Sequence, residues 1–211
     1  MASEALPDVS DNLDPTRMYL GIDLTPATAG YKPGEKKSLQ EYAMLDAQDE
    51  SLRRWKESLG ITSDSAGAVR PDSPKLTIHS LMLESQQLPG GGVGIQLDQP
   101  GELEKLAKSP LQITEGIEYS VVIKFSVGCE VLSGLKYLQV VKRAGVPVDR
   151  IEEMIGSFPP RAEPYVKRFA PSIAPSGFLA RSGTNSVRTR IVDDDGSVFA
   201  DFSWAFKLVK A

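Results

Sequence analysis

Residues capable of nucleophilic or metal chemistry are scarce in this chain. His79 is the sole histidine and Cys129 the sole cysteine among the 211 residues. A Cys-His nucleophile or a zinc cluster needs such side chains in groups, and nothing in the spacing of these two pairs them. We therefore expect both to be ordinary strand residues, and we expect no catalytic residue, no bound metal and no cofactor.

Two short motifs suggest ligand chemistry, but each has a plainer interpretation. The run from Pro89 to Gly94 is rich in glycine, yet no Lys-Ser or Lys-Thr follows it and no helix opens after it, so a loose hairpin connection is favoured over a phosphate cradle. The triplet Asp193 to Asp195 lacks the alternating oxygen donors and the closing Glu of a calcium loop. We interpret it as a polar turn that presents a carboxylate to a partner.

Composition sets the class of protein. Hydrophobic residues make up 41% of the chain, which is enough for one buried core. Residues 1–30 carry five acids and one base and thereby account for the whole net charge of -4. Because the remaining charges balance, no basic field for nucleic acid exists. A lone cysteine and apolar segments of only strand length predict a cytoplasmic, soluble, non-secreted chain with no stable membrane insertion.

The elements that must position any site fall into two parts. Residues 1–30 predict a disordered acidic tail, since they have few large apolar groups. Residues 31–60 predict a helical regulatory arm whose first helix runs from about Leu39 to Asp46. Ser38 would cap that helix, with Glu41 completing a capping box. Leu39, Tyr42 and Leu45 recur on one face of it.

A second short helix is expected beyond Asp49. Leu52, Trp55 and Leu59 form its apolar stripe, and Gly60 supplies its C-terminal stop. Both helices are shorter than the roughly 12 to 15 residues at which isolated helices become marginal in water. They either pack permanently on the rest of the chain or fold as a clamp on a partner, and the linker expected at 61–74 favours the clamp.

Residues 75–211 are rich in strands. Alternation at period two is strongest from Tyr119 to Val127 and returns from Phe202 to Leu208. Further strands are expected at Leu76 to Leu83, Gly94 to Asp98, Leu111 to Thr114, Val131 to Lys142, Glu153 to Phe158, Tyr165 to Phe169 and Val187 to Val192. Only Glu102 to Lys108 is helical in pattern. Short strands joined by turns at this spacing predict an all-β, immunoglobulin-like β-sandwich.

Two groups of side chains on these strands have open interpretations. Tyr119, Phe125, Phe202, Trp204 and Phe206 lie on inward faces and either fill a core or line a slot between splayed sheets. A basic series, which consists of Arg181, Arg188 and Arg190, lies beside apolar strand positions. We expect these side chains to keep their charges in water while their aliphatic parts cover the sandwich.

Several long, collinear stretches resemble the Rho GDP-dissociation inhibitors. They are YKPGEKKSLQEYAMLDAQDESLRRWKESL, ITEGIEYSVVIKFSV, VLSGLKYLQVVKRAGVPVD, MIGSFPPRAEPY, GFLARSGTNSVRTRIVDDDG and FSWAFKLV. The resemblance covers Tyr31 to Lys210. It implies a non-enzymatic protein that binds prenylated, GDP-bound Rho-family small GTPases in a one-to-one complex, inhibits GDP release and extracts them from membranes into the cytosol. The geranylgeranyl lipid would lie between the sheets of a prenyl-binding domain at 75–211.

The resemblance also carries site residues onto this sequence. Asp49 matches an arm aspartate that meets the first switch, and Asp195 matches a body carboxylate facing the second. The GTPase-binding set that the resemblance implies is Tyr31, Ser38, Leu45, Asp49, Ser51, Leu52, Trp55, Asp194 and Asp195. The prenyl-binding set is Leu83, Leu111, Tyr119, Val131, Leu179, Val187, Trp204 and Phe206.

Rival functions stay open at this stage. A general prenyl- or lipid-binding carrier that solubilises its cargo would use the same slot without recognising GTPase switch regions. A lipid hydrolase is disfavoured because the sequence has no nucleophile elbow and no paired histidine.

Overall fold

The computed structural model describes residues 41, 44–45, 48–58 and 73–210. Its elements are α3 (Glu50–Ser58), β1 (Leu76–Glu84), the 3₁₀ turn η2 (Pro89–Gly91), β2 (Gly92–Gln96), α4 (Glu102–Lys108), β3 (Leu111–Thr114), β4 (Glu118–Val127), β5 (Leu132–Arg143), β6 (Val146–Phe158), β7 (Tyr165–Arg168), β8 (Ser172–Ile173), α5 (Phe178–Arg181), β9 (Asn185–Val192) and β10 (Val198–Val209). The expected acidic tail, nearly all of the expected linker, and Tyr31 and Ser38 lie outside the described residues.

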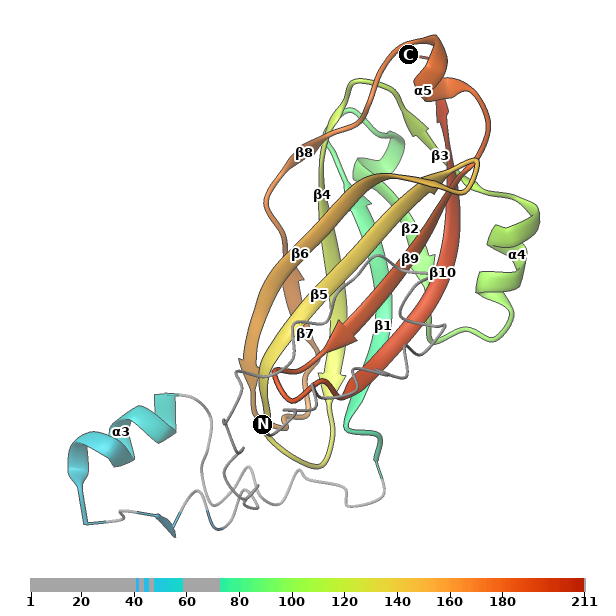
Figure 1. The fold of residues 1–211 in the computed structure, drawn as a ribbon. Helices are drawn as coiled ribbons and strands as arrows, with labels where there is room; N and C mark the ends of the chain where they lie inside the picture. Colours follow the sequence, from blue (N-terminus) through green and yellow to red (C-terminus); the bar gives the residue numbers. More distant parts are fainter. Residues whose placement is uncertain (1–40, 42–43, 46–47, 59–72, 211) are drawn as a thin grey trace, which may run out of the picture.

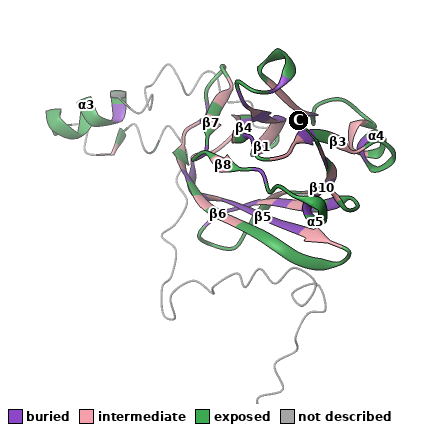
Figure 2. Ribbon diagram, turned by 90° about the horizontal axis from the view of Figure 1, so that it is seen from above, coloured by how far each residue is buried: buried purple, intermediate pink, exposed green. Residues whose placement is uncertain are grey.

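Two packed sheets form the body (Figure 1). One has the order β2-β1-β4-β7, with β8 also paired to β4, and the other has the order β3-β10-β9-β5-β6. Every pairing is antiparallel except that of β3 with β10. Viewed from above, the two sheets are separate layers (Figure 2). The predicted all-β immunoglobulin-like sandwich is therefore confirmed.

The core forms where the inward faces of both sheets meet. On β4 the alternating Val121, Ile123, Phe125 and Val127 are each at most 3% exposed, as the period-two pattern predicts. Tyr137 on β5 faces them and is fully buried. Full burial of a side chain of this size stabilises the fold by about 1.5 to 3 kcal/mol, so the inward row of β4 is a main source of stability.

Aromatic rings close one end of the sandwich. Phe125, Phe158 and Tyr165 pack together with ring centroids 4.7 to 5.6 Å apart. The Arg161 guanidinium lies 3.5 Å from the centroid of the Tyr165 ring, and the Tyr165 hydroxyl donates to the Pro159 carbonyl at 2.7 Å. Phe125 is therefore a core residue, and this end of the space between the sheets is filled.

Strand β6 is longer than the sequence predicts. The expected strand began at Glu153, whereas β6 begins at Val146 and pairs with β5 along most of its length. The first half of β6 is an edge strand with exposed side chains, so it has no apolar alternation to reveal it. Ala144 and Gly145, with φ of 48° and 81°, form the two-residue turn that joins β5 to β6.

Both short motifs serve as connections. The Gly-rich run forms η2 and the start of β2, which pairs with β1 as a hairpin. A Cβ added at Gly94 would lie 2.4 Å from the Leu81 carbonyl oxygen, so this close approach requires glycine. The acidic triplet forms the turn between β9 and β10, where the Asp193 carboxylate accepts from the Ser197 N–H at 2.8 Å.

The basic series forms ion pairs at the surface. Arg188 and Arg190 both donate to the Asp201 carboxylate, with contacts of 2.6 to 2.9 Å, and Arg181 pairs with Glu115. The side chains of Arg181, Arg188 and Arg190 keep 15% to 32% of their area exposed, so these ion pairs lie at the surface of the sandwich, where the expectation placed the charges.

Candidate functional site

A cavity of about 210 Å³ lies between the two sheets. Its apolar lining comes from both sheets and from the loop before α5. The lining residues are Leu83, Ile113, Tyr119, Val141, Val148, Pro175, Trp204 and Phe206, together with the polar Gln139, Arg143, Asp149 and Asn185. The space between the sheets is therefore a packed core at one end and a cavity at the other.

The position of the cavity mouth follows from the burial of its lining. Leu83, Ile113 and Trp204 are at most 4% exposed and form the floor. Val148 is 49% exposed, and Asp149 and Pro175 are exposed as well. The mouth thus lies at the end of the sandwich that carries the start of β6 and the loop leading to α5.

Strand β10 presents the aromatic wall of the cavity. The Trp204 and Phe206 rings lie two residues apart on the same face, with centroids 5.9 Å apart. The indole N–H of Trp204 donates to the Thr189 hydroxyl at 3.1 Å, so the polar atom of this side chain has its hydrogen-bond partner on the neighbouring strand β9. What Trp204 offers to the cavity is consequently its apolar ring surface.

A polar group borders the cavity near its mouth. The Asn185 side chain is 1% exposed, and its Oδ1 accepts from Arg143 Nε at 3.0 Å. Within the described part of the chain its Nδ2 has no hydrogen-bond partner. Burial raises the pKa of the Tyr119 hydroxyl, and the nearby Asp149 carboxylate adds to the effect. Tyr119 therefore remains neutral and lines the cavity as a largely apolar ring.

Four of the eight predicted prenyl-binding residues line this cavity: Leu83, Tyr119, Trp204 and Phe206. Leu111 and Val187 pack in the core beside it, in register with Phe206 and Trp204 respectively. Leu179 lies on α5 and is 76% exposed. Val131 lies ten residues before Val141, roughly 30 Å along an extended strand, so the structure does not bring it to the cavity.

Several lining residues were missed from the sequence. Gln139, Val141 and Arg143 share one face of β5, and period two alone would have grouped them. Their mixed polarity hid the pattern, since polar residues normally mark a solvent face. Val148 and Asp149 were missed because the start of β6 was not recognised as a strand.

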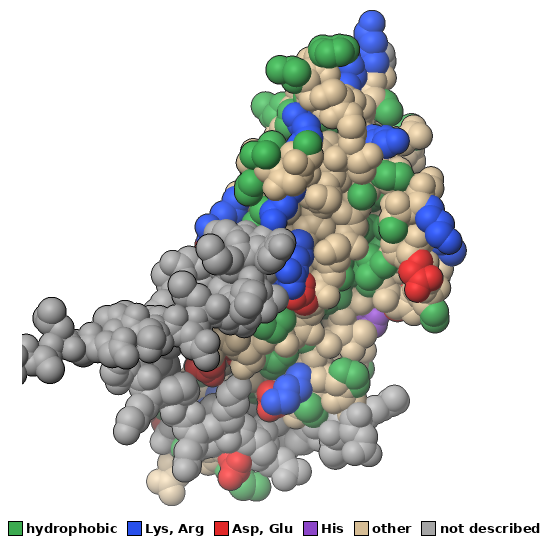
Figure 3. All heavy atoms as spheres, turned by 45° about the vertical axis from the view of Figure 1, so that its right-hand side comes forward, with side chains coloured by type: hydrophobic (Ala, Val, Ile, Leu, Met, Phe, Trp, Pro, Cys, Tyr) green, Lys and Arg blue, Asp and Glu red, His purple; other side chains and the backbone are tan. Residues whose placement is uncertain are grey.

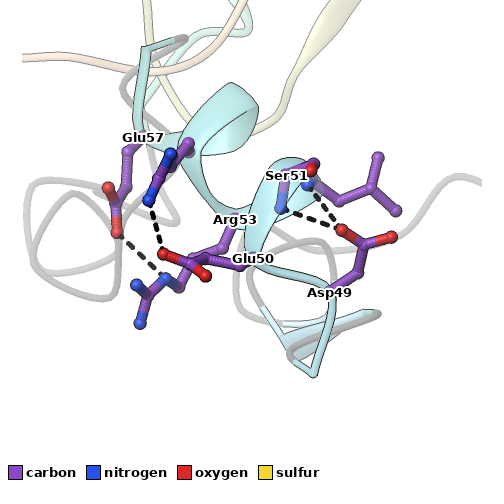
Figure 4. A network of polar contacts seen from close by, with 7 residues as sticks. Asp49, Glu50, Ser51, Arg53 and Glu57 are labelled. Atoms are coloured by element: carbon purple, nitrogen blue, oxygen red, sulfur yellow. Dashed lines mark hydrogen bonds and ion pairs between the residues drawn. The ribbon is translucent and has the colours of Figure 1, made fainter.

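The arm helix α3 begins at an aspartate cap. Asp49 Oδ1 accepts hydrogen bonds from the backbone N–H groups of Ser51 at 2.9 Å and Leu52 at 3.1 Å (Figure 4). This is N-cap geometry, which satisfies two otherwise unpaired donors of the first turn. Asp49 thus has a structural role that the sequence pattern did not predict, and its second oxygen, Oδ2, points away from the helix backbone (Figure 4).

One side of α3 carries ion pairs, and the other carries Leu52 and Trp55 beside Lys56, whose Nζ donates to the Leu45 carbonyl. Glu50 pairs with Arg54 at 2.6 Å and Arg53 with Glu57 at 3.8 Å, each four residues apart. Leu52 is 38% exposed and Trp55 58% exposed. Of the expected first helix, only Glu41, Met44 and Leu45 are described, and the Leu45 N–H donates to the Glu41 carbonyl at 3.0 Å, a helical bond. The second predicted helix, expected beyond Asp49, is confirmed by α3.

The predicted carboxylates of the body lie in the β9–β10 turn. Asp194 pairs with Lys136 at 2.7 Å, and Asp195 is exposed. Gly134 faces this turn with φ of 63°, and a Cβ there would clash with the Asp194 side chain. Because β9 runs from Asn185 at the cavity to this turn, the carboxylates and the cavity mouth lie at opposite ends of the sandwich (Figure 1).

A larger hollow of about 620 Å³ lies on the other side of Tyr119. Its remaining lining is polar, apart from Gly91, and includes Glu84, Ser85, Gln86, Gln87, Glu118, Ser120 and Arg168. A hydrocarbon gains little from such surroundings, because burial against charged and amide groups would cost their hydration. The smaller apolar cavity is the better candidate for a lipid.

The described residues provide neither a metal-binding cluster nor a membrane-spanning helix. Among residues 41, 44–45, 48–58 and 73–210, no three His, Cys, Asp or Glu side chains are grouped to hold a metal ion. None of the helices described there is long and apolar enough to cross a membrane. His79 Nε2 lies 2.7 Å from the Ser126 hydroxyl oxygen, a contact between neighbouring strands.

Comparison with known proteins places the chain in a family. The family described as RHO protein GDP dissociation inhibitor matches residues 22–211. Rho GDP-dissociation inhibitor of Schizosaccharomyces pombe is 40% identical over 178 residues, covering 84% of this chain and 85% of the relative. Rho GDP-dissociation inhibitor 1 of Homo sapiens is 39% identical, covering 87% of each chain. Rho GDP-dissociation inhibitor of Saccharomyces cerevisiae is 37% identical, covering 85% of this chain and 90% of the relative. With a strand-rich sandwich, an internal apolar cavity and matches of this extent, the chain belongs to the Rho GDP-dissociation inhibitor family.

Proposed function

We propose that this protein binds prenylated Rho-family small GTPases in their GDP-bound form, inhibits release of the nucleotide and carries them from membranes into the cytosol as one-to-one complexes. It acts without catalysis and without a cofactor. The observation that carries this proposal is the apolar cavity between the sheets, open at one end. Family membership supplies the class of cargo.

The cavity suits a prenyl tail in chemistry but must widen to hold one. An engineered apolar cavity of about 150 Å³ accommodates benzene, so the roughly 20 carbons of a geranylgeranyl chain need on the order of 500 Å³. The observed volume is about 210 Å³. Because β6 is an edge strand paired only with β5, we infer that the slot opens by displacement of the start of β6, which carries the lining residues Val148 and Asp149.

The slot alone does not explain extraction from a membrane. Removing about 20 carbons from water is worth on the order of 10 kcal/mol or more, but the bilayer offers a similar gain. Transfer between the two is therefore nearly neutral. Contacts with the GTPase must supply the difference, and the arm is the natural source of them.

The arm would bind the switch regions. Leu52 and Trp55 offer apolar area, since both are exposed on one side of α3. Asp49 accepts its cap bonds on Oδ1, which leaves Oδ2 to accept from a donor on the GTPase. Leu45, Ser51, Tyr31 and Ser38 remain proposed arm contacts. Held in this way, the switches would keep GDP enclosed.

The two ends of the sandwich would bind two parts of one GTPase. Asp194 and Asp195 would face the second switch region, whereas the prenyl tail would enter roughly 30 Å away, past Asn185. A flexible C-terminal segment of about nine or more residues is needed to span that distance. Of the residues that the resemblance suggested for the slot, we retain Leu83, Tyr119, Trp204 and Phe206 as lining, with Leu111 and Val187 behind them.

A titration on liposomes tests the proposal. Prenylated, GDP-loaded Rho-type GTPase is bound to vesicles, and the full chain is compared with a chain lacking residues 1–60. We expect the full chain to release the GTPase into solution and the shortened chain to release much less. Failure of the full chain to release any GTPase would contradict the proposal.

The second candidate is a general lipid carrier that does not recognise switch regions. The cavity by itself supports it equally well, since its lining is apolar on both sheets. Such a carrier would bind a prenylated peptide without a GTPase domain as tightly as it binds the prenylated GTPase. A difference of more than tenfold in favour of the GTPase would exclude it.

A further inference from the structure

Large apolar side chains are exposed around the cavity mouth. Phe178 and Leu179 on α5 are 78% and 76% exposed, Ile173 on β8 is 72% exposed, and Val146 at the start of β6 is 62% exposed. We call these four residues the apolar rim. Single exposed apolar residues are ordinary on protein surfaces, but several beside one apolar cavity mark an interaction site.

Named contacts hold the rim at the mouth. Arg143, which lines the cavity, donates from Nη1 to the Leu179 carbonyl at 3.2 Å and from Nε to Asn185 Oδ1. This guanidinium joins α5 to the end of β5, where Arg143 is in register with the exposed Val146 of β6. Figure 2 looks down on this end, with α5 beside β10.

The other side of the rim is fixed in the same way. The Gly177 N–H donates to Glu115 at 2.8 Å, and Arg181 pairs with the same carboxylate. Ile173 is in register with Glu118, the residue before Tyr119 of the cavity wall. The exposed rim side chains are therefore held by hydrogen bonds and strand pairing, and their exposure does not come from a loose segment.

Charged residues of both signs accompany the apolar side chains. Arg143, Arg181 and Lys210 lie around α5 and the end of β10, and Lys210 and Arg181 both act on the Glu115 carboxylate. The Gly177 N–H first, and then Arg181 and Lys210, hold the pKa of Glu115 below its usual range. The acids at this end are Glu115, Glu118 and Asp149, so they balance the three bases. In Figure 3, hydrophobic and basic side chains lie together at the top of the molecule.

We propose that the apolar rim docks reversibly on a lipid bilayer and brings the cavity mouth against the membrane surface. The inference rests on the proposed function, because it explains how a prenyl chain passes between bilayer and slot without crossing water. Apolar side chains that enter the interface are a feature of surface-bound proteins, and here they flank the mouth of an apolar cavity. Four side chains give weak attachment, as release of the loaded complex requires.

Sedimentation of the full-length protein with vesicles tests the rim directly. The vesicles contain either phosphatidylcholine alone or phosphatidylcholine with phosphatidylserine, and no GTPase is present. The test variant carries Val146→Ser and Phe178→Ser, neither of which lines the cavity. The matched control carries Val166→Ser and Val198→Ser, which are 65% and 47% exposed on β7 and β10 away from the mouth.

We expect wild type and control to bind both kinds of vesicle alike, and the test variant to bind them roughly tenfold more weakly, because the rim contributes apolar area and no net charge. Equal sedimentation of all three proteins, or of none, would overturn the proposal. Affinity for prenylated GTPase without membranes is measured in parallel. An unchanged value in the test variant supports a lipid partner, whereas a tenfold loss would show that the rim contacts the GTPase and would overturn it.

The same pair of measurements separates this inference from the proposed function. Failure of the wild-type protein to bind prenylated GTPase would contradict the proposed function, while the vesicle result without GTPase would still decide the role of the rim. A final readout is the rate of GTPase extraction from phosphatidylserine vesicles. It is expected to fall roughly tenfold in the test variant only.

Discussion

Asp49 has two separable roles, and substitutions at this position can measure each of them. The carboxylate caps α3 through Oδ1 and is proposed to accept a hydrogen bond from the GTPase through Oδ2. Alanine removes both interactions. Serine keeps a side-chain oxygen that caps helices well but is too short to extend a second acceptor outward. The comparison of Asp49→Ala with Asp49→Ser therefore isolates the contact with the partner.

The magnitudes follow from the two interactions. Loss of an N-cap costs about 1 kcal/mol, and a hydrogen bond to a charged group contributes about 1.5 to 3 kcal/mol. A nine-residue helix is too short to be stable alone, so the cap energy enters the binding free energy when the arm orders on its partner. Asp49→Ser should weaken binding by roughly 10- to 150-fold, and Asp49→Ala by about five- to tenfold more.

The assay is the dissociation constant for prenylated, GDP-loaded Rho-type GTPase, measured by titration calorimetry with the full chain. Arg53→Ala is the control, because Arg53 lies on the charged side of the same helix and its exposed ion pair is worth at most about 1 kcal/mol. Wild-type affinity in Asp49→Ser together with weak binding in Asp49→Ala would refute the reasoning. Asp49 would then be a helix cap and nothing more.

Three further predictions concern the body. Leu83→Phe adds volume to the cavity floor, so it should lower affinity for prenylated GTPase at least tenfold and leave affinity for unprenylated GTPase unchanged. Equal losses of affinity for both forms, or a melting temperature far below that of wild type, would point to misfolding. Ala144→Asn should stabilise the protein by up to about 1 kcal/mol in urea unfolding, since Ala144 has φ of 48° in a turn that favours asparagine, and lower stability would contradict the turn assignment. Hydrogen bonds from Arg188 and then Arg190 hold the pKa of Asp201 below its usual value, so its stabilisation is present above about pH 4 and is lost as pH falls through the lowered pKa. Asp201→Asn should therefore destabilise by about 1 kcal/mol at pH 7 and progressively less in acid, and a cost that does not change with pH would contradict the pairing.

The sequence was most informative where burial is one-sided. Period two from Tyr119 to Val127 predicted both a strand and its inward face, because a sheet that is buried on one side must alternate. Glu102–Lys108 was predicted with its observed bounds, since its acids come first, its bases come last and Leu106 is buried. The first half of β6 gave no such pattern, because exposed edge strands need no apolar face.

The candidate site was predictable only in part. Trp204 and Phe206 were expected to be either core or slot lining, and both line a cavity while they also pack on the core. Whether an inward face is filled depends on how far the two sheets splay, which is a property of both sheets and not of one segment. Likewise, the capping role of Asp49 follows from backbone geometry, which the resemblance to a family could not supply.

The central claim is that one GTPase is bound at once by the slot and by the arm. Its most direct test is the affinity of wild type and Asp49→Ser for GDP-loaded Rho-type GTPase, with and without the prenyl group. We predict that removal of the prenyl group weakens wild-type binding at least a hundredfold, and that the residual binding still falls tenfold or more in Asp49→Ser. Equal affinity for prenylated and unprenylated GTPase would contradict the account.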